Sequence, residues 1–275
     1  MPDTPSAPAS LEPAVASVMV RRHGQLADAS DRVAVERALE IRVNGHPFSV
    51  VMRTPGADEA LAAGFLCGEG LLRQWTDVDR VEPVDADVVN VVVSRGRADA
   101  AAAALTRTRP VMVTASCGVC GRPEIDSLSR GLAPLPAGWR IGAAVLTGLT
   151  DAIAAAQPAF AQTGGLHAAA LFDADGHLVD SAEDIGRHNA VDKLIGRALL
   201  QKRLPLAQRA LLVSGRTSFE IVQKAWVAGV PVLASVSAPS DLAVSTAVRA
   251  GITLAGFLRG DRFNVYAHRD RIAGL

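Results

Sequence analysis

The second half of the chain alternates short apolar runs with amphipathic segments, and this order constrains the fold more than any other feature. A predicted helix over 143–156 precedes a hairpin of two strands, 166–172 and 178–181. Strands and helices then alternate, and we expect helices over 187–200, 219–228 and 240–249 and strands over 210–213, 231–235, 252–257 and 263–268. The order is one helix, two strands and then alternating helices and strands. This order predicts an α/β fold with three layers, a sandwich in which helices cover both faces of a sheet.

The first half predicts a smaller α+β domain. Asn44-Gly45 between alternating apolar runs is a strong hairpin signal, so we expect strands over 33–36, 39–43 and 48–52. The run 54–58 opens a helix whose apolar side includes Leu61, Gly64, Phe65, Leu71 and Leu72. The remaining expected elements are a strand over 88–93, a helix over 98–105, a strand over 111–113 and a short helix over 123–128.

A boundary between the two halves is predicted at 131–138, where Gly and Pro are dense. We therefore expect a flexible tail over 1–16, an α+β domain over 17–138 and an α/β domain over 139–275.

Charge and composition exclude several kinds of partner. Lys+Arg and Asp+Glu both number 28 and aromatics make up 4% of the chain, so neither polyanion binding nor base stacking is indicated. The three cysteines cannot form a disulfide framework and fit a reducing compartment. The Pro-, Ala- and Ser-rich start lacks the pattern of a signal peptide, and no apolar stretch has membrane-spanning length. We expect a cytoplasmic protein with no nucleic-acid or membrane partner.

Two cysteines lie two residues apart in the glycine-flanked run 114–121. Cys117 and Cys120 indicate metal binding, redox exchange or sulfur chemistry, because a buried structural cysteine needs neither a second thiol nor flanking glycines. Two incidental small residues in a turn are the alternative. Cys67 lies on a predicted apolar helix and is expected to be a packed thiol.

Three kinds of chemistry fit the cysteine pair poorly. A structural zinc site needs four close Cys or His ligands, and the chain has one pair and scattered histidines. A zinc deaminase needs His-x-Glu and Pro-Cys-x-x-Cys at two helix starts, where this chain has Arg187-His188 and Arg216-Thr217. A thioredoxin-like dithiol needs a preceding βαβ unit, which is missing. A metal-free sulfur relay through a persulfide remains, so no metal site is expected.

Arginines and hydroxyls gather at the predicted strand-to-helix turns. Arg187 and His188 open one helix, Arg216 and Thr217 precede the next, and Ser240 and Asp241 begin a third. Free amides at helix starts beside arginines favour an anion, and in an open α/β sheet these turns lie on one rim. Each turn has an alternative interpretation as an ordinary capped helix. The strand-to-strand turn 256–262 adds two more arginines, or is a solvated hairpin.

These segments together resemble the FdhD family of formate dehydrogenase accessory sulfurtransferases, over about residues 17–268. The long run 183–193 is the most specific part of the match. The matching residues are Thr54-Pro55-Gly56, Gly64-Phe65-Leu66, Glu69-Gly70, and those at 116–121, 183–193, 215–220 and 235–239.

The resemblance implies a sulfur carrier. Such proteins take persulfide sulfur from a cysteine desulfurase and pass it to the molybdenum cofactor, bis(molybdopterin guanine dinucleotide), before that cofactor enters formate dehydrogenase. By position, Cys117 would be the persulfide residue and Cys120 its partner. The implied second domain resembles cytidine deaminase. The family's cofactor-binding stretch maps onto Phe257, Leu258, Arg259, Gly260, Asp261 and Arg262.

The arginine turns extend that expected site. We hypothesise that Arg187, His188, Arg216 and Thr217 also contact the cofactor, and that a guanine nucleotide such as GDP mimics it. Two other functions stay open: a non-catalytic chaperone for the cofactor, and a dithiol oxidoreductase. A homodimer is the default expectation for the oligomeric state.

Overall fold

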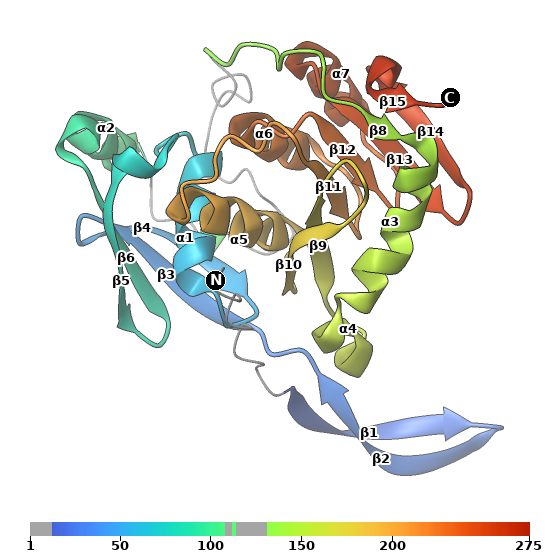
Figure 1. The fold of residues 1–275 in the computed structure, drawn as a ribbon. Helices are drawn as coiled ribbons and strands as arrows, with labels where there is room; N and C mark the ends of the chain where they lie inside the picture. Colours follow the sequence, from blue (N-terminus) through green and yellow to red (C-terminus); the bar gives the residue numbers. More distant parts are fainter. Residues whose placement is uncertain (1–12, 108–111, 114–130) are drawn as a thin grey trace, which may run out of the picture.

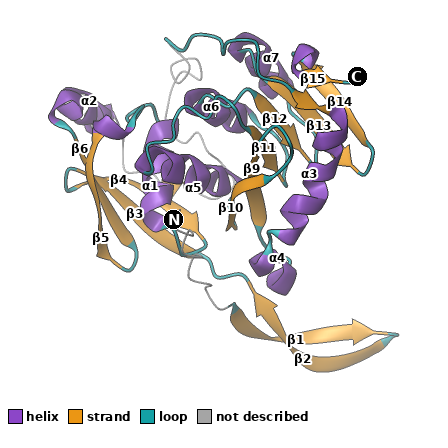
Figure 2. Cartoon of the chain, viewed as in Figure 1, coloured by secondary structure: helices purple, strands orange, loops and turns teal. Residues whose placement is uncertain are grey.

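The computed structural model describes residues 13–107, 112–113 and 131–275. A sheet with helices on both faces forms the larger part of the molecule, a second sheet packs beside it, and a two-stranded arm projects from the body (Figure 1). The helices and strands alternate through the second half of the chain (Figure 2), as the sequence predicts.

Among the described residues the large sheet has six strands in the order β10-β9-β11-β12-β13-β14. Strands β10, β11, β12 and β13 run in one direction, because β11 pairs in parallel with β12 and β12 with β13, while β9 is antiparallel to both β10 and β11. The bounds are β9 His167–Phe172, β10 Leu178–Asp184, β11 Ala210–Val213, β12 Val232–Ser235, β13 Thr253–Arg259 and β14 Arg262–Ala267.

Helices cover the two faces of this sheet and confirm the expected three layers. Along β9, Ala169 and Leu171 face one core with α5, α6 and α7, while Ala168 and Phe172 face another core with α3. This alternation follows from the two-residue period of a strand. The helices are α3 Ala143–Ala155, α4 Pro158–Thr163, α5 Arg187–Leu200, α6 Phe219–Ala228 and α7 Asp241–Ala250.

The first half forms a five-stranded sheet in the order β5-β6-β3-β4-β7, with helix α1 Asp58–Gly68 against it. The predicted hairpin turn is confirmed: Asn44 and Gly45 have φ of 51° and 82°, as a tight two-residue turn requires. The strands are β3 Arg37–Val43, β4 His46–Arg53, β5 Val78–Asp85, β6 Val88–Val93 and β7 Met112–Val113, and the other helices are η1 Trp75–Asp77, η2 Arg95–Arg97 and α2 Ala98–Arg107.

Helix α1 also packs against α5 through two glycines. A Cβ atom on Gly64 would lie 1.9 Å from the carbonyl oxygen of Asp192, and one on Gly196 would lie 1.8 Å from that of Ala60. No Cβ atom can lie this close to a carbonyl oxygen. Helices α1 and α5 therefore approach each other this closely only because residues 64 and 196 are glycines, which have no side chain. The contact joins the halves of the chain in one hydrophobic core.

The start of the chain differs from the prediction. Strands β1 Ala14–Arg22 and β2 Gln25–Val33 form an antiparallel hairpin, so residues 14–16 of the expected tail belong to a strand. Residues 1–12 lie outside the described residues. The expected strand at 33–36 is wrong, because Val33 ends β2 and residues 34–36 cross to β3 without regular structure.

The segment predicted as the boundary, 131–138, is hydrogen-bonded to the second half of the chain. Leu135 donates its backbone N–H to the carbonyl of Ala250, and Trp226 Nε1 donates to the carbonyl of Ala133. Beyond this segment β8 Ile141–Gly142 pairs with β15 Ile272–Ala273, which follows η4 Arg269–Arg271. In the described part of the chain, no helix is long and apolar enough to cross a membrane.

Candidate functional site

The carboxyl ends of β10, β11, β12 and β13 lie along one rim of the large sheet, as the sequence predicts. The segments at these strand ends are 185–186, 214–218, 236–240 and 257–261; the last three carry polar residues, and the first, Ile185-Gly186, leads directly to Arg187. Neighbouring turns are hydrogen-bonded. Thr217 donates its backbone N–H to Ala238, and Phe257 donates its N–H to Ser237, at 3.2 Å each. The last three segments are therefore joined to one another at the position where open α/β sheets bind ligands.

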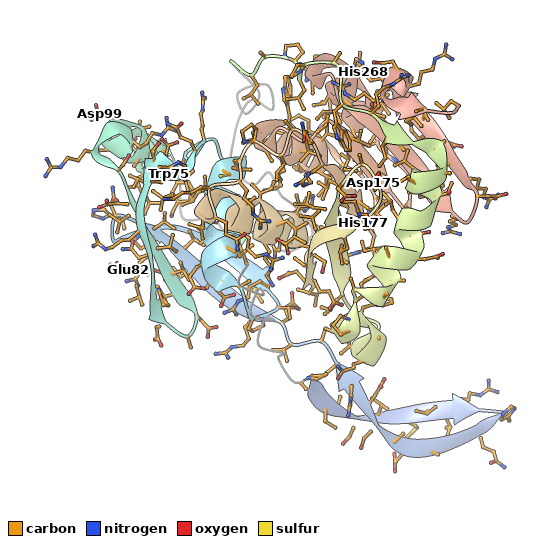
Figure 3. The ribbon with its side chains drawn as sticks, in the orientation of Figure 1. Trp75, Glu82, Asp99, Asp175, His177 and His268 are labelled. Carbon is orange, nitrogen blue, oxygen red and sulfur yellow. The ribbon has the colours of Figure 1, made fainter. Side chains whose placement is uncertain are left out.

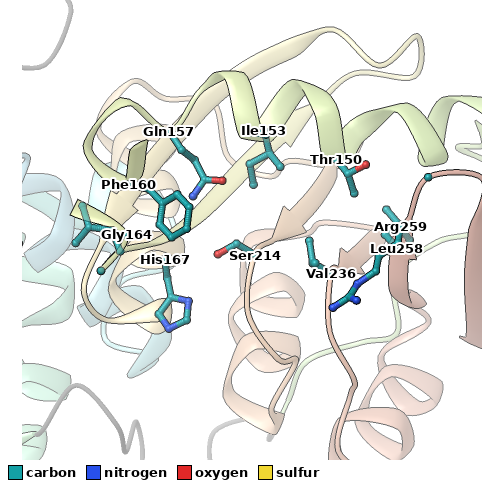
Figure 4. A pocket seen from close by; sticks show the side chains of 14 residues that line it. Thr150, Ile153, Gln157, Phe160, Gly164, His167, Ser214, Val236, Leu258 and Arg259 are labelled. Atoms are coloured by element: carbon teal, nitrogen blue, oxygen red, sulfur yellow. The ribbon is translucent and has the colours of Figure 1, made fainter. Parts of the chain in front are cut away.

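A cavity of about 650 Å³ lies at this rim (Figure 4). Helices α3 and α4 form one wall with apolar and polar side chains, and the sheet rim forms the other. The second wall contains His167 at the start of β9, Ser214 after β11, and Leu258, Arg259 and Gly260 at the end of β13. The volume is in the range of ligand-binding cavities, and the lining is apolar with a few polar groups, as is typical of them.

His167 and Arg187 lie close together beside this cavity. A Cβ atom on Gly215 would lie 3.4 Å from Nδ1 of His167 and 3.5 Å from Cδ of Arg187, so the backbone at 215 passes close to both side chains. Burial lowers the pKa of His167, and the charge of Arg187 lowers it further. His167 is therefore neutral at pH 7, and its ring can accept or donate a hydrogen bond.

Arg187 has unused hydrogen-bonding capacity. Its Nε is buried and has no acceptor among the described residues. Within the same part of the chain, no carboxylate pairs with Arg187, Arg216, Arg259 or Arg262. Unpaired arginines at a rim favour an anion, because the guanidinium fork fits phosphate oxygens.

His188 belongs to a small hydrogen-bonded cluster behind the rim. Its Nε2 lies 3.1 Å from Oγ of Ser218 and 3.4 Å from Oε2 of Glu220, and the imidazole is buried. The hydrogen bond from His188, together with the one that Ser218 donates, lowers the pKa of Glu220 to about 2. The cluster joins the starts of α5 and α6 and holds their turns together.

The most specific sequence run, 183–193, holds the turn before α5 in place. Asp184 is fully buried, pairs with Lys193 at 2.7 Å and accepts hydrogen bonds from the backbone of Gly186 and the side chain of Asn189. Lys193 also donates to the carbonyl of Thr54, at 2.9 Å. The carboxylate and the ammonium are thus both satisfied, as buried charges require.

This network joins the two halves of the chain. Thr54 accepts at its hydroxyl from the backbone N–H of Ile185, and Asn189 donates to the carbonyl of Met52. Glu183 caps α4 instead, accepting from the backbone N–H groups of Ala159 and Phe160 at 3.0 and 2.7 Å. The run therefore fixes both the Arg187 turn and the helix that forms one cavity wall.

The turn between β13 and β14 carries the expected cofactor-binding stretch. Leu258 is fully buried, whereas Phe257, Arg259, Asp261 and Arg262 are exposed. Phe257 has a φ of 57°, a left-handed conformation that is strained for an aromatic residue and is common at binding sites. Phe257, Arg259, Arg262 and Asn264 line a second cavity of about 360 Å³, so Arg259 borders both cavities.

The other predicted site residues are distributed unevenly. Arg216 is exposed beside the rim, whereas Thr217 is buried at 1% exposure and its Oγ1 has no partner among the described residues. Cys117 and Cys120 lie outside the described residues. Cys67 is the packed thiol that the sequence predicts: it is fully buried, and burial, with the charge of Asp192, raises its pKa to about 12.

One group of metal-ligand residues occurs in the described part of the chain. Asp173, Asp175 and His177 stand together at the tip of the β9–β10 hairpin, at the end of the sheet opposite the rim, and Figure 3 labels Asp175 and His177. Asp173 accepts the backbone N–H groups of Asp175 and His177, so the carboxylate shapes the turn.

The site predicted from the sequence leaves out several cavity residues. Ser214 is one hydroxyl in the run 214–220, and His167, at the start of a strand, is more often a structural hydrogen-bonding residue when it stands alone. Helix α4, which carries Phe160, is too short to show helical periodicity. The available signals were weak: Pro158 at the first helical position and Gly164, which has a φ of 65°, at the C-terminal cap.

Comparison with known proteins places these features in a family. The FdhD/NarQ family pattern matches residues 34–273. A protein of Streptomyces coelicolor named sulfur carrier protein FdhD is 49% identical over 262 residues, 92% of this chain and 93% of its own. A Mycobacterium tuberculosis protein with the same name is 49% identical over 253 residues, 88% of this chain and 92% of its own.

A solved structure has the same fold. The crystal structure of a Desulfotalea psychrophila protein, described as an accessory protein of formate dehydrogenase, superimposes with a TM-score of 0.75 at 25% identity. The match covers 95% of this chain and 100% of the other.

Proposed function

The chain belongs to the FdhD/NarQ family, and we propose that it is a sulfur carrier for the maturation of formate dehydrogenase. It receives sulfur from a cysteine desulfurase as a persulfide on Cys117. It then passes that sulfur to bis(molybdopterin guanine dinucleotide) molybdenum cofactor, which formate dehydrogenase receives afterwards. The cofactor is a bound substrate here.

The sheet rim is the observation that best supports cofactor binding, the first part of this proposal. Three of the four strand ends along the rim present arginines that have no carboxylate partner among the described residues, and a cavity of about 650 Å³ lies beside them. The proposed ligand carries several phosphates and two guanine nucleotides, so it needs cationic groups on more than one turn. Arg259 lines the cavity at the end of β13, and Arg187, at the start of α5, lies beside Gly215 and the lining residue His167.

The remaining cavity groups suit the nucleoside part of such a ligand. Phe160, Ile153 and Leu258 offer apolar contacts, while Ser214 and the neutral imidazole of His167 offer hydrogen bonds. Because the imidazole of His167 is neutral, it adds no positive charge beside Arg187 and can serve as a hydrogen-bonding group. GDP, which carries one guanine and two phosphates, is the simplest probe for this cavity.

The thiol half of the proposal rests on the cysteine pair and on the named relatives. The Cys117 thiolate attacks the outer sulfur of the donor's persulfide, a new S–S bond forms on Cys117, and the donor cysteine leaves as a thiolate. Cys67 is excluded as the acceptor by its burial and its raised pKa, because only an accessible thiolate is nucleophilic.

Mass spectrometry tests the thiol assignment. The native chain is incubated with a cysteine desulfurase and cysteine and then digested. We expect a gain of one sulfur atom on the peptide that contains Cys117. Cys117→Ala removes this gain and Cys67→Ala, the matched control, keeps it. Sulfur loading that persists in Cys117→Ala would show that the persulfide residue is a different one.

The chaperone function predicts a different result. A chain that binds GDP at the rim but never acquires sulfur, even with several desulfurases, would only hold the cofactor and would not transfer sulfur to it. GDP binding and sulfur loading are therefore measured on the same preparation. A chain that has lost only sulfur loading can then be distinguished from one that has lost both activities.

A further inference from the structure

Helix α4, Pro158–Thr163, forms part of the wall of the larger cavity although little of its own surface is covered. Among the described residues, none of the six in this helix is buried. A helix of this length is not stable by itself in water, because it makes too few internal hydrogen bonds to offset the cost of nucleation. The position of α4 therefore depends on a few tertiary contacts.

Glu183 accepts two of the three hydrogen bonds that join α4 to other helices or strands in the described part of the chain. Its carboxylate oxygens accept the backbone N–H of Ala159 at 3.0 Å and that of Phe160 at 2.7 Å. Arg32 donates the third, to Oε1 of Gln162 at 3.1 Å, between two exposed side chains. The N–H groups of a first helical turn have no acceptor within the helix, so a carboxylate there is the stronger of these contacts.

The place of Glu183 in β10 directs its side chain toward α4. Glu183 and Asp184 are neighbours in a strand, so their side chains point to opposite faces of the sheet. Asp184 holds the turn before α5 through Lys193, whereas Glu183 reaches α4 on the other face. Lys193 also donates to the carbonyl of Glu183, at 3.3 Å, and so fixes the backbone from which this carboxylate extends.

Phe160 is the side chain that α4 presents to the cavity. Its ring is 43% exposed and lies with Gln157 and His167 at one end of the cavity, whereas Arg259 lies toward the other end (Figure 4). An accessible aromatic ring can stack on a nucleotide base. A nucleotide that places its phosphates near Arg259 can therefore place its base against Phe160.

We propose that Glu183 is a positioning residue for the nucleotide part of the ligand, because its carboxylate holds α4 where the ring of Phe160 meets the base. Glu183 is not among the described residues that line the cavity, so it acts through α4 and not by contact with the ligand. The inference rests on the proposed function, which takes a guanine nucleotide to be part of the ligand.

Isothermal titration calorimetry of the full chain with GDP tests this role. Glu183→Ala and Phe160→Ala should each weaken binding ~10-fold, because both remove the ring from the base. Glu183→Gln keeps one acceptor oxygen and should weaken binding only ~3-fold. Asp99→Ala is the matched control: it removes an exposed acid from the first turn of α2, and it should bind GDP as the native chain does.

A double substitution separates positioning from an independent effect. If Glu183 acts through Phe160, the chain with both Glu183→Ala and Phe160→Ala should bind GDP only ~10-fold more weakly than the native chain. Independent losses would instead multiply to ~100-fold, and that result would overturn the role of Glu183.

Hydrogen exchange without ligand tests the contact itself. Amides of residues 159–163 should exchange at least ~10-fold faster in Glu183→Ala than in the native chain, while the amides of α5 keep their protection. Binding of GDP by the native chain together with unchanged exchange in α4 of the variant would overturn the role of Glu183 alone. A native chain that binds no GDP would contradict the proposed function and, with it, this role.

Discussion

At the scale of single residues, Arg259 is the side chain that most directly connects the rim with a ligand. It borders both cavities at the sheet edge and has no carboxylate partner among the described residues. Its guanidinium is therefore available to a phosphate that lies across the β13–β14 turn. The strained backbone of Phe257, two residues earlier, fixes the direction in which the turn projects.

Replacing Arg259 by Ala should weaken GDP binding by ~10- to 100-fold, the usual loss for a charge-assisted hydrogen bond. Isothermal titration calorimetry measures the change. Arg95→Ala removes an exposed arginine in η2, in the first half of the chain, and should leave the affinity unchanged. Equal affinities for the native chain and Arg259→Ala would place the nucleotide elsewhere.

Glu220 makes the stability of the chain sensitive to acid. Hydrogen bonds from His188 and Ser218 lower its pKa from 4.5 to about 2. A folded-state pKa below the unfolded value means that the carboxylate stabilises the fold above pH 4.5. The contribution is then lost progressively as the pH falls from 4.5 toward 2.

Glu220→Gln should therefore lower the free energy of unfolding by ~1–3 kcal/mol at pH 7 and by much less near pH 2. Urea denaturation at both pH values measures the difference between native chain and variant. If the variant has the same deficit at both pH values, the charge of Glu220 does not account for its effect.

At the scale of elements, the contact between α1 and α5 positions the site. Helix α5 begins at Arg187, and its tight packing on α1 through Gly64 and Gly196 fixes where that arginine stands relative to the sheet. The buried pair Asp184–Lys193 and the bonds to Thr54 reinforce the same contact. The most characteristic run of the sequence thus serves the geometry of the site more than its chemistry.

Gly196→Ala should destabilise the chain by more than ~3 kcal/mol, because a Cβ atom would meet the carbonyl oxygen of Ala60 at 1.8 Å. Gly148→Ala in α3 is the matched control. Its Cβ atom would meet nothing within 4 Å, and alanine favours a helix, so this variant should gain ~0.5–1 kcal/mol. Thermal unfolding of both variants measures the contrast, and a stable Gly196→Ala would mean that the helices are further apart.

Much of the second half could be predicted because its elements repeat a strong pattern. The expected ranges 187–200, 210–213 and 219–228 are confirmed residue for residue. The helix expected over 240–249 spans Asp241–Ala250, and Ser240 is its N-cap, accepting from the N–H of Ala243. The arm could not be predicted, since neither of its faces packs on a core and its pattern has no polar side. The expected helix through Leu71 and Leu72 ends earlier, at Gly68.

The site was predictable in outline and not in detail. The order of strands and helices places the arginine turns on one rim, because parallel strands share their carboxyl ends. The partners of His188 and the proximity of His167 to Arg187 depend on tertiary packing between turns that lie 20 or more residues apart. No local pattern in the sequence specifies such contacts.

At the scale of the whole molecule, the chain combines a sheet rim that we propose as the site of an anionic ligand with a thiol pair outside the described residues. The rim and the thiol pair can be tested separately. Variants of the rim arginines should bind GDP poorly but still acquire a persulfide, whereas Cys117 variants should bind GDP normally but acquire no persulfide.

Sulfur transfer itself tests the central claim most directly. The chain is loaded with radioactive sulfur from a cysteine desulfurase, separated from the donor, and mixed with molybdenum cofactor and formate dehydrogenase that lacks it. We predict that label appears in the enzyme's cofactor, that Cys117→Ala delivers none, and that Arg259→Ala loads normally but delivers at least ~10-fold more slowly. Delivery by Cys117→Ala at the native rate would contradict the account.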